Sequence, residues 1–206
     1  MPEPGAGHAK QLCWGSTSAG NDMRVSASAL DWQKAREVHE RFSAKTHSEH
    51  IASEFALAHL AAVLRTNEIK SVLEFGAGIG TMTYLLLSTL PESATVESTE
   101  ANELCLAVLG ENLPPEGRDR LIVHAEGSPP SERAFDLVII DGDITHGSDF
   151  LERGSICFAE GNRSKARKAI ELSLNERGLT CRFTNHLPSD DKKGCWIGRI
   201  DLCAAS

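Results

Sequence analysis

The sequence predicts an α/β protein: a doubly wound, mostly parallel sheet of seven strands, with helices on both faces and a C-terminal antiparallel hairpin. Short apolar runs alternate with helical patterns from residue 70 onward. Runs such as "FDLVIID" (135–141) are apolar on both faces, as strands covered on both sides are. Only "HLPSDDKKG" (186–194) separates the last two runs, which predicts a hairpin because no crossover helix fits there.

Two helices are expected before the sheet begins. In "SASALDWQKAREVHERF" the spacing of Ser28 and Asp31 is that of a capping box, which marks a helix start. In "THSEHIASEFALAHLAAVLR" Thr46 and Glu49 have the same spacing, and apolar residues form a stripe along the segment. We therefore expect a second helix that begins at Thr46.

The remaining elements follow in regular order. The helices are expected to end where breakers occur, at Pro91, before Pro114 and at Gly178, and Asn162 or Ser164 is the expected cap of the last one. The expected strands are 71–75, 94–99, 121–125, 135–141, 155–161, 179–185 and 195–202, and the expected helices are 81–90, 101–113 and 163–178.

The length and charge of the chain limit what it can be. With 206 residues it has room for one α/β domain. We expect a mobile arm over residues 1–24, which are rich in Gly, Ser, Ala and Pro, and a single domain over 25–206 whose N-terminal helices occupy 25–66. The 21 basic and 29 acidic residues leave a net charge of −8, which argues against a nucleic-acid-binding or membrane surface.

The composition also favours a cytoplasmic location. The sequence has no run of 18 apolar residues, and its start lacks the pattern of a signal peptide. The six cysteines form no CxxC pair, and several lie within apolar runs. A reduced, cytoplasmic protein is therefore expected.

The stretch "LEFGAGIGT" (73–81) predicts a ligand site at the end of the first sheet strand. Gly76 and Gly78 would let the backbone approach a ligand closely, and Gly80 would let the next helix pack on the sheet. A dinucleotide-binding turn reads GxGxxG, whereas the spacing here is GxGxG. Glu74, two residues before the first glycine, would repel a pyrophosphate and attract a cationic ligand.

Two further acids are expected beside this turn. Glu100 ends the second strand, 24 residues after Gly76, at the place of an acid that accepts hydrogen bonds from ribose hydroxyls. Asp141 ends the strand "FDLVIID". Glu74, Glu100 and Asp141 together suit a cationic nucleoside without phosphates, and S-adenosylmethionine is such a compound.

With these motifs in place, the chain resembles the class I S-adenosylmethionine-dependent methyltransferases, which have a Rossmann-like fold. "VLEFGAGIGT" is similar to their first motif, "VESTEAN" to the acidic second-strand motif, and "FDLVIIDGD" to the fourth. The resemblance covers roughly residues 46–201. It implies a seven-stranded sheet with a reversed C-terminal hairpin.

The resemblance also implies positions for the parts of the cofactor. The loop from Gly76 to Thr81, Ala77 included, would lie along the methionine part, and Glu100 would bind the ribose. Glu126, in "HAEGS", would contact the exocyclic amine of the adenine, although the family often has Gly-Asp where this chain has Glu-Gly. The helix that contains His47 and His50 would help to cover the site. Zinc binding by these two histidines is disfavoured because no third ligand is evident.

The chemistry itself is expected over "IDGDITHGSD" (140–149). Methyl transfer is an in-line displacement, in which the enzyme positions the acceptor, excludes water and in some cases removes a proton. Asp143 and His146 are the candidate bases. Some catechol-type members hold a divalent cation; Asp141, Glu160 and Asn162 would be compared with its ligands, but Gly161 interrupts that pattern and a metal site is disfavoured.

Three functions remain open from the sequence. The first is transfer of a methyl group from S-adenosylmethionine to a small-molecule acceptor, since the chain is short and lacks a basic surface. The second is a noncatalytic Rossmann-like binding protein, and the third a nicotinamide-dependent oxidoreductase. The third is disfavoured because Tyr84 is the only tyrosine and belongs to no Tyr-x-x-x-Lys pair. The acceptor, the atom methylated and any homodimer are left undetermined.

Overall fold

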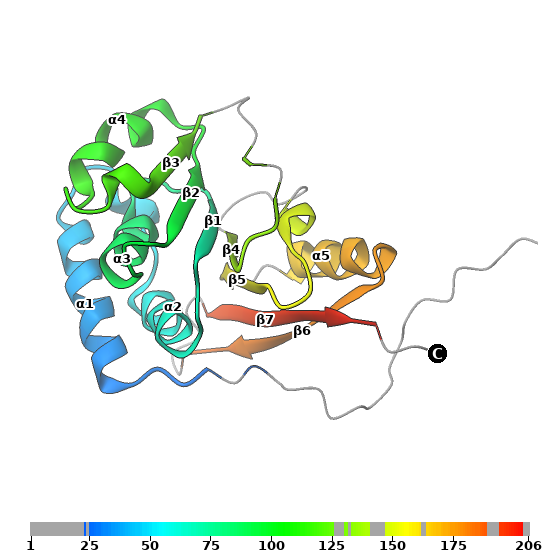
Figure 1. Cartoon of the computed structure of the whole chain (residues 1–206). Helices are drawn as coiled ribbons and strands as arrows, with labels where there is room; N and C mark the ends of the chain where they lie inside the picture. The colour runs from blue at the N-terminus through cyan, green and yellow to red at the C-terminus, as the bar shows by residue number, and fades with distance from the viewer. Residues whose placement is uncertain are drawn as a thin grey trace, which may run out of the picture.

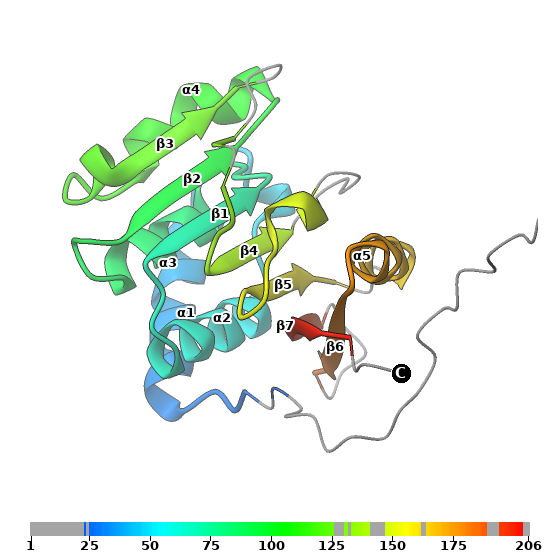
Figure 2. The ribbon, with the colours of Figure 1, turned by 45° about the vertical axis from the view of Figure 1, so that its right-hand side comes forward.

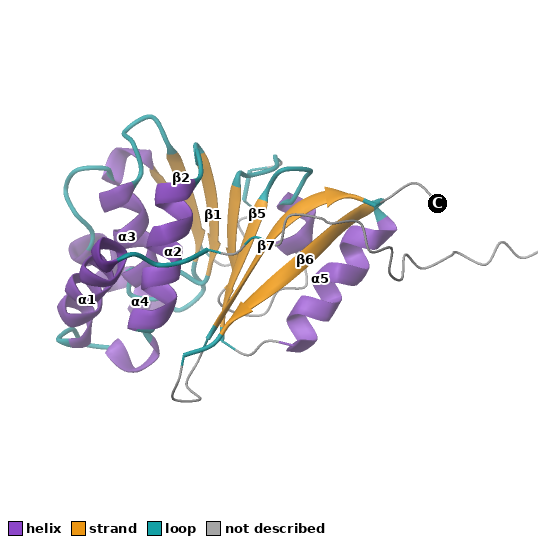
Figure 3. Cartoon of the chain, turned by 90° about the horizontal axis from the view of Figure 1, so that it is seen from below, coloured by secondary structure: helices purple, strands orange, loops and turns teal. Residues whose placement is uncertain are grey.

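The protein folds around a single mixed sheet with helices on both faces. A computed structural model describes residues 23, 25–125, 130–131, 133–140, 147–161, 164–188 and 194–203. Helices α1, α2, α3 and α4 lie on one side of the sheet and α5 on the other (Figure 1, Figure 3). The predicted mobile arm, residues 1–24, lies outside the described residues except for Met23.

The sheet has seven strands in the order β3-β2-β1-β4-β5-β7-β6. Strands β1 to β5 run parallel, while β7 pairs antiparallel with both β5 and β6 at one end. The predicted fold class is therefore confirmed, including the C-terminal hairpin. The strands are β1 (Ser71–Phe75), β2 (Thr95–Thr99), β3 (Leu121–His124), β4 (Leu137–Ile140), β5 (Ile156–Glu160), β6 (Leu179–His186) and β7 (Cys195–Leu202).

The helices begin and end at the residues that local chemistry favours, with one exception. The α-helices are α1 (Ala29–Ser43), α2 (Glu54–Thr66), α3 (Thr81–Thr89), α4 (Glu103–Asn112) and α5 (Ser164–Glu176), and the 3-10 helices are η1 (Ser48–His50), η2 (Arg118–Arg120) and η3 (Gly147–Phe150). The capping box of Ser28 and Asp31 opens α1 as predicted. Gly178 follows α5 with a φ of 72°, as expected for a residue that ends a helix.

The exception is the start of α2, where the sequence prediction is wrong. The helix begins at Glu54 instead of Thr46, because the Ser53 hydroxyl accepts the Ala56 N–H at 3.2 Å and caps the helix there. Before it, His47 has a left-handed backbone with a φ of 65°, which is incompatible with a continuous helix. Residues 47–52 therefore form a separate segment, called the strap below.

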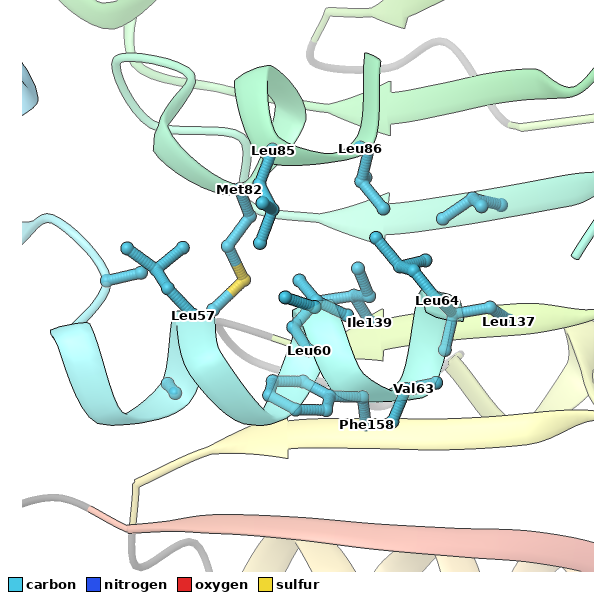
Figure 4. Close-up of a cluster of buried hydrophobic side chains, with 14 of the residues drawn as sticks. Leu57, Leu60, Val63, Leu64, Met82, Leu85, Leu86, Leu137, Ile139 and Phe158 are labelled. Atoms are coloured by element: carbon cyan, nitrogen blue, oxygen red, sulfur yellow. The ribbon is translucent and has the colours of Figure 1, made fainter. Parts of the chain in front are cut away.

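The larger hydrophobic core lies between the sheet and helices α1, α2 and α3. Nine consecutive residues of α2, from Ala56 to Leu64, are buried, and all of them except His59 are apolar. Figure 4 shows Leu57 and Leu60 of α2 facing Met82 and Leu85 of α3, beside side chains of β4 and β5. Because Met82 belongs to both this core and the ligand cavity described below, the core supports the wall of that cavity.

A polar network fills the opposite face of the sheet near β2 and β3, where no described helix lies (Figure 2). Glu97 of β2 is fully buried, and its carboxylate is 2.8 Å from His124 Nε2. It also accepts the Ser131 N–H at 3.0 Å and an Arg133 N–H at 3.0 Å. Burial raises the pKa of the Glu97 carboxyl, but these hydrogen bonds outweigh burial and lower the pKa to about 2.

This network predicts a pH-dependent contribution to stability. The Glu97→Gln variant should lose about 2 kcal/mol of unfolding free energy at pH 7, because charge-assisted hydrogen bonds are lost. The lowered pKa means that the carboxylate stabilises the fold above about pH 4.5, and that this stabilisation is lost as the pH falls toward 2. Urea unfolding of both proteins at pH 7, 5 and 3 should therefore show a difference that shrinks with acidity.

The exposed Glu92 provides the control, because Glu92→Gln removes the same charge at the surface and should leave stability nearly unchanged. A Glu97→Gln difference that stays constant from pH 7 to pH 3 would contradict the proposed charge dependence.

Candidate functional site

The glycine turn between β1 and α3 has a backbone that requires its glycines. Gly76, Gly78 and Gly80 have φ angles of 86°, 55° and 96°, in the left-handed region that side chains disfavour. A side chain on Gly80 would also meet Leu109 and Leu113 of α4, at 2.7 and 3.1 Å from an added Cβ. The third glycine thus permits close packing of the turn on α4, whereas the sequence analysis assigned it to packing of the next helix on the sheet.

Neighbouring elements hold this turn by hydrogen bonds. The Thr99 carbonyl, at the end of β2, accepts the N–H groups of Gly76 at 3.1 Å and Ala77 at 2.9 Å. From α4, the buried Asn112 side chain donates to the Ile79 carbonyl at 3.0 Å. The parallel register places Phe75 beside both Thr99 and Ile140, so that β1, β2 and β4 end at the same edge of the sheet. The turn therefore has a fixed shape, defined by β2 and α4.

A cavity of about 160 Å³ lies beside the turn. Its walls come from four places: the end of β1 with the turn, the first residues of α3, the start of α4, and the strap. The lining residues are Glu74, Gly76, Ala77, Gly78, Ile79, Thr81, Met82, Asn102, Leu104, Cys105, His47, Glu49, His50, Ile51 and Ala52. The structure thus brings together the turn that the sequence singled out and a segment more than twenty residues before it.

Glu74 supplies a buried negative group to this cavity. Its side chain is only 1% exposed, and its carboxylate accepts the Thr83 hydroxyl at 2.6 Å and the Ser98 hydroxyl at 2.8 Å. Hydroxyl donors of this kind satisfy a buried carboxylate, and Glu74 thereby brings carboxylate oxygens to the wall of the cavity.

The start of α3 supplies the opposite polarity. Its N-cap, Gly80, makes no side-chain capping bond, so the partial positive charge of this helix end faces the turn. The Thr81 hydroxyl is buried, lines the cavity and has no hydrogen-bond partner among the described residues. A buried hydroxyl normally has a partner, so this oxygen is a candidate ligand contact.

Glu100 lies beside the turn but not in the wall of the cavity. Its two carboxylate oxygens accept the Gly78 N–H at 2.6 Å and the Asn102 N–H at 2.7 Å. It therefore holds the middle of the glycine turn against the start of α4. Each carboxylate oxygen can accept a second hydrogen bond, so these contacts leave capacity for a ligand.

Several predicted residues lie outside the described part of the chain. These are Glu126 and Asp141 among the cofactor residues, the candidate bases Asp143 and His146, and Asn162. Among the described residues, no group of three or more His, Cys, Asp and Glu side chains is arranged to hold a metal ion. Glu160, the described member of the compared metal-binding set, accepts hydrogen bonds from Ser53.

Other cavity residues were not predicted from the sequence. Asn102, Leu104 and Cys105 reach the cavity because α4 begins directly after β2. Glu49 and Ile51 reach it because the strap lies beside the glycine turn as a segment separate from α2. The left-handed His47 that ends helical geometry there has no sequence signal, because glycine and asparagine are the usual residues of that region.

Comparison with known proteins supports the fold. No family model matches the sequence, and no curated protein matches it. Among solved structures, the O-methyltransferase TomG from Streptomyces achromogenes, solved with S-adenosylmethionine, is similar with a TM-score of 0.57 and 14% identity, over 87% of this chain and 92% of that one. An O-methyltransferase from Bacillus cereus, in complex with SAH, is similar with a TM-score of 0.55 and 14% identity, over 84% and 91%.

The chain therefore has the fold of the class I S-adenosylmethionine-dependent methyltransferases, as its motifs indicated. The seven strands form one continuous sheet in which only β7 is reversed, and the glycine turn follows its strand β1. In such a sheet, ligands bind beyond the carboxyl ends of the strands, which is where the cavity lies.

The backbone of the turn predicts a steric effect at Gly80. The Gly80→Ala variant should lose about 2 kcal/mol of stability, because the left-handed backbone at this position disfavours a Cβ and the added Cβ would displace Leu109 and Leu113. For a chain of this size the melting temperature should fall by about 4–8 °C, measured by circular dichroism.

Gly110 provides the matched control on α4. An added Cβ there meets nothing within 4 Å, and the residue lies in a helix, so Gly110→Ala should raise stability by about 0.5–1 kcal/mol. Equal melting temperatures for the two variants would contradict the steric requirement at Gly80.

Proposed function

We propose that this protein is an S-adenosylmethionine-dependent methyltransferase that acts on a small-molecule acceptor. The observation that carries the proposal is the buried Glu74 carboxylate in the cavity wall beside the glycine turn. A pyrophosphate at this turn would be repelled by the Glu74 carboxylate. S-adenosylmethionine carries an ammonium and a sulfonium and no phosphate, so the same carboxylate would attract it.

The cavity fits the amino-acid half of this cofactor. An amino acid needs opposite charges close together, and the cavity presents them: Glu74 for the ammonium, and the start of α3 with the Thr81 hydroxyl for the carboxylate. Gly76, Ala77 and Gly78 would follow the methionine chain between them.

We assign the ribose to Glu100, at the end of β2. Its oxygens already accept two backbone N–H groups, and their remaining lone pairs would accept the ribose hydroxyls. The carboxylate would then join the cofactor to the glycine turn. Glu126 remains our candidate for the adenine amine, and Asp141 for the acidic rim.

For the reaction, the bound sulfonium would donate its methyl group to an acceptor placed in line with it. The residues proposed to remove a proton from the acceptor are Asp143 and His146, which follow β4 directly in the sequence. The protein's main contribution would be to hold the two reactants together and to exclude water. No divalent cation is included in this proposal.

A small-molecule acceptor agrees with the charge and the neighbours of the chain. The net charge of −8 leaves no broad surface for nucleic acid or anionic membranes. No helix in the described ranges has the length and apolar character needed to span a bilayer. TomG is described as involved in tomaymycin synthesis. The five described cysteines are free thiols, in keeping with a reducing compartment such as the cytoplasm.

Thermal shift measurements test the cofactor directly. Addition of S-adenosylmethionine or S-adenosylhomocysteine at about 100 times Kd should stabilise the native state by about 2.7 kcal/mol and raise the melting temperature. NAD at the same concentration should have no effect. Stabilisation by NAD alone would support the oxidoreductase alternative, and cofactor binding without transfer across a broad acceptor panel would support a noncatalytic protein.

The ribose assignment predicts the effect of one substitution. Glu100→Ala should weaken S-adenosylhomocysteine binding at least tenfold, about 1.4 kcal/mol, because the ribose hydroxyls lose a charged acceptor and Gly78 loses its tether. Isothermal titration calorimetry measures this change. Glu103→Ala, which removes an exposed acid three residues later, is the control and should bind normally. Unchanged affinity in Glu100→Ala would remove Glu100 from the cofactor site.

A further inference from the structure

We propose that Glu160 is a positioning residue for the cofactor: it fixes the strap, residues 47–52, against the amino-acid half of S-adenosylmethionine. The proposal rests on the cofactor assignment above. It gives Glu160 a role different from that of a metal ligand. It also accounts for how the strap, which the sequence placed in a helix expected to cover the site, is held in place.

Glu160 is the last residue of β5, on the same edge of the sheet as the glycine turn. Its side chain is 6% exposed, although a carboxylate is costly to bury without hydrogen bonds. In the antiparallel register Glu160 lies opposite Cys195 of β7, so pairing with β7 holds its backbone. The carboxylate therefore has a fixed place at the edge of the site.

From that place Glu160 binds the residue that joins the strap to α2. One carboxylate oxygen accepts both the N–H and the hydroxyl of Ser53, each at 2.9 Å, across 107 residues of sequence. Ser53 in turn caps α2 by accepting the Ala56 N–H. A carboxylate at the start of a helix is also favoured by the helix dipole. We call this contact between Glu160 and Ser53 the latch.

The strap contains few buried residues. Its 3-10 turn, Ser48–His50, contains no buried residue, and within the strap only Ala52 is buried. The preceding end follows α1 through exposed residues 43–46. Low burial makes a segment easy to displace. At the end of the strap next to α2, Ile51 packs against the core and the latch adds a polar contact that fixes this end.

The strap forms one wall of the cavity. His47, Glu49, His50 and Ile51 line it together with the glycine turn and Thr81. Glu100, the proposed ribose residue, is not among the lining residues. The strap would therefore contact the amino-acid half of the cofactor and leave the adenosine half untouched.

This geometry predicts a selective kinetic effect. With the latch broken, the strap would move away from the amino-acid half, and the ligand would dissociate faster. S-adenosylhomocysteine contains this half, whereas 5′-methylthioadenosine has the adenosine half without the amino acid. A loss confined to the first ligand separates positioning from general destabilisation.

The experiment compares dissociation rates by surface plasmon resonance on the immobilised full chain. Glu160→Gln and Ser53→Ala should each release S-adenosylhomocysteine at least tenfold faster than the unchanged protein, while 5′-methylthioadenosine dissociates at the same rate within twofold. Ser53→Thr keeps both donors of the latch and should restore slow release.

Asp31→Asn is the matched control, because Asp31 fixes the other end of α2 through Arg65, at 2.8 Å. It should lower the melting temperature without changing either dissociation rate. Unchanged release of S-adenosylhomocysteine from Glu160→Gln, or equal acceleration for both ligands, would overturn the latch. Absence of binding to the unchanged protein would instead refute the proposed cofactor.

Hydrogen–deuterium exchange on the unchanged protein gives a second test that does not depend on a variant folding. S-adenosylhomocysteine should slow exchange in peptides that cover residues 45–53, and 5′-methylthioadenosine should slow it less. Equal protection by the two ligands would contradict contact between the strap and the amino-acid half.

Discussion

The contact between the end of β2 and the glycine turn is the interaction on which the site depends. The Thr99 carbonyl and the Glu100 carboxylate together bind three successive N–H groups of the turn, from Gly76 to Gly78. These N–H groups lie beyond the end of β1, so they need acceptors from the neighbouring strand β2 and from a side chain. Because β1 and β2 are parallel and Phe75 pairs with Thr99, the two strands end side by side, and the acceptors after β2 lie next to the turn after β1. The turn then directs α3 back over the sheet, where Met82 and Leu85 join the core.

Three buried glutamates connect the layers of the protein in a similar way. Glu74 joins β1 to β2 and α3 through hydroxyl groups, Glu97 joins β2 to β3 and the segment before β4, and Glu160 joins β5 to the start of α2. A buried carboxylate is stable only where several donors meet it, so each of these residues specifies one relative placement of its neighbours. In Glu74 and Glu160 the same requirement also shapes the proposed cofactor site.

The sequence predicted most of the fold because local signals and the global pattern agreed. The apolar runs, Pro91 and Gly178 marked element types and ends that the structure confirms. The predicted start of α2 was wrong because the sequence offers two possible helix caps. Thr46 and Glu49 have the spacing of a capping box, but only Ser53 is held by Glu160, a residue 107 positions away. Likewise, the sequence places Glu97 within a strand but does not predict its partners His124 and Arg133, because they lie far from it along the chain.

By itself the sequence determined the alternation of strands and helices, the glycine turn and the acid at its start, since these depend on neighbouring residues and on periodicity. The tertiary structure decided what faces that turn. The strap, the Thr81 hydroxyl that lacks a partner among the described residues, and the contact of Glu100 with Gly78 arise from the packing of segments distant in the chain. Spacing along a sequence does not encode such contacts, because they depend on where separate elements end in space.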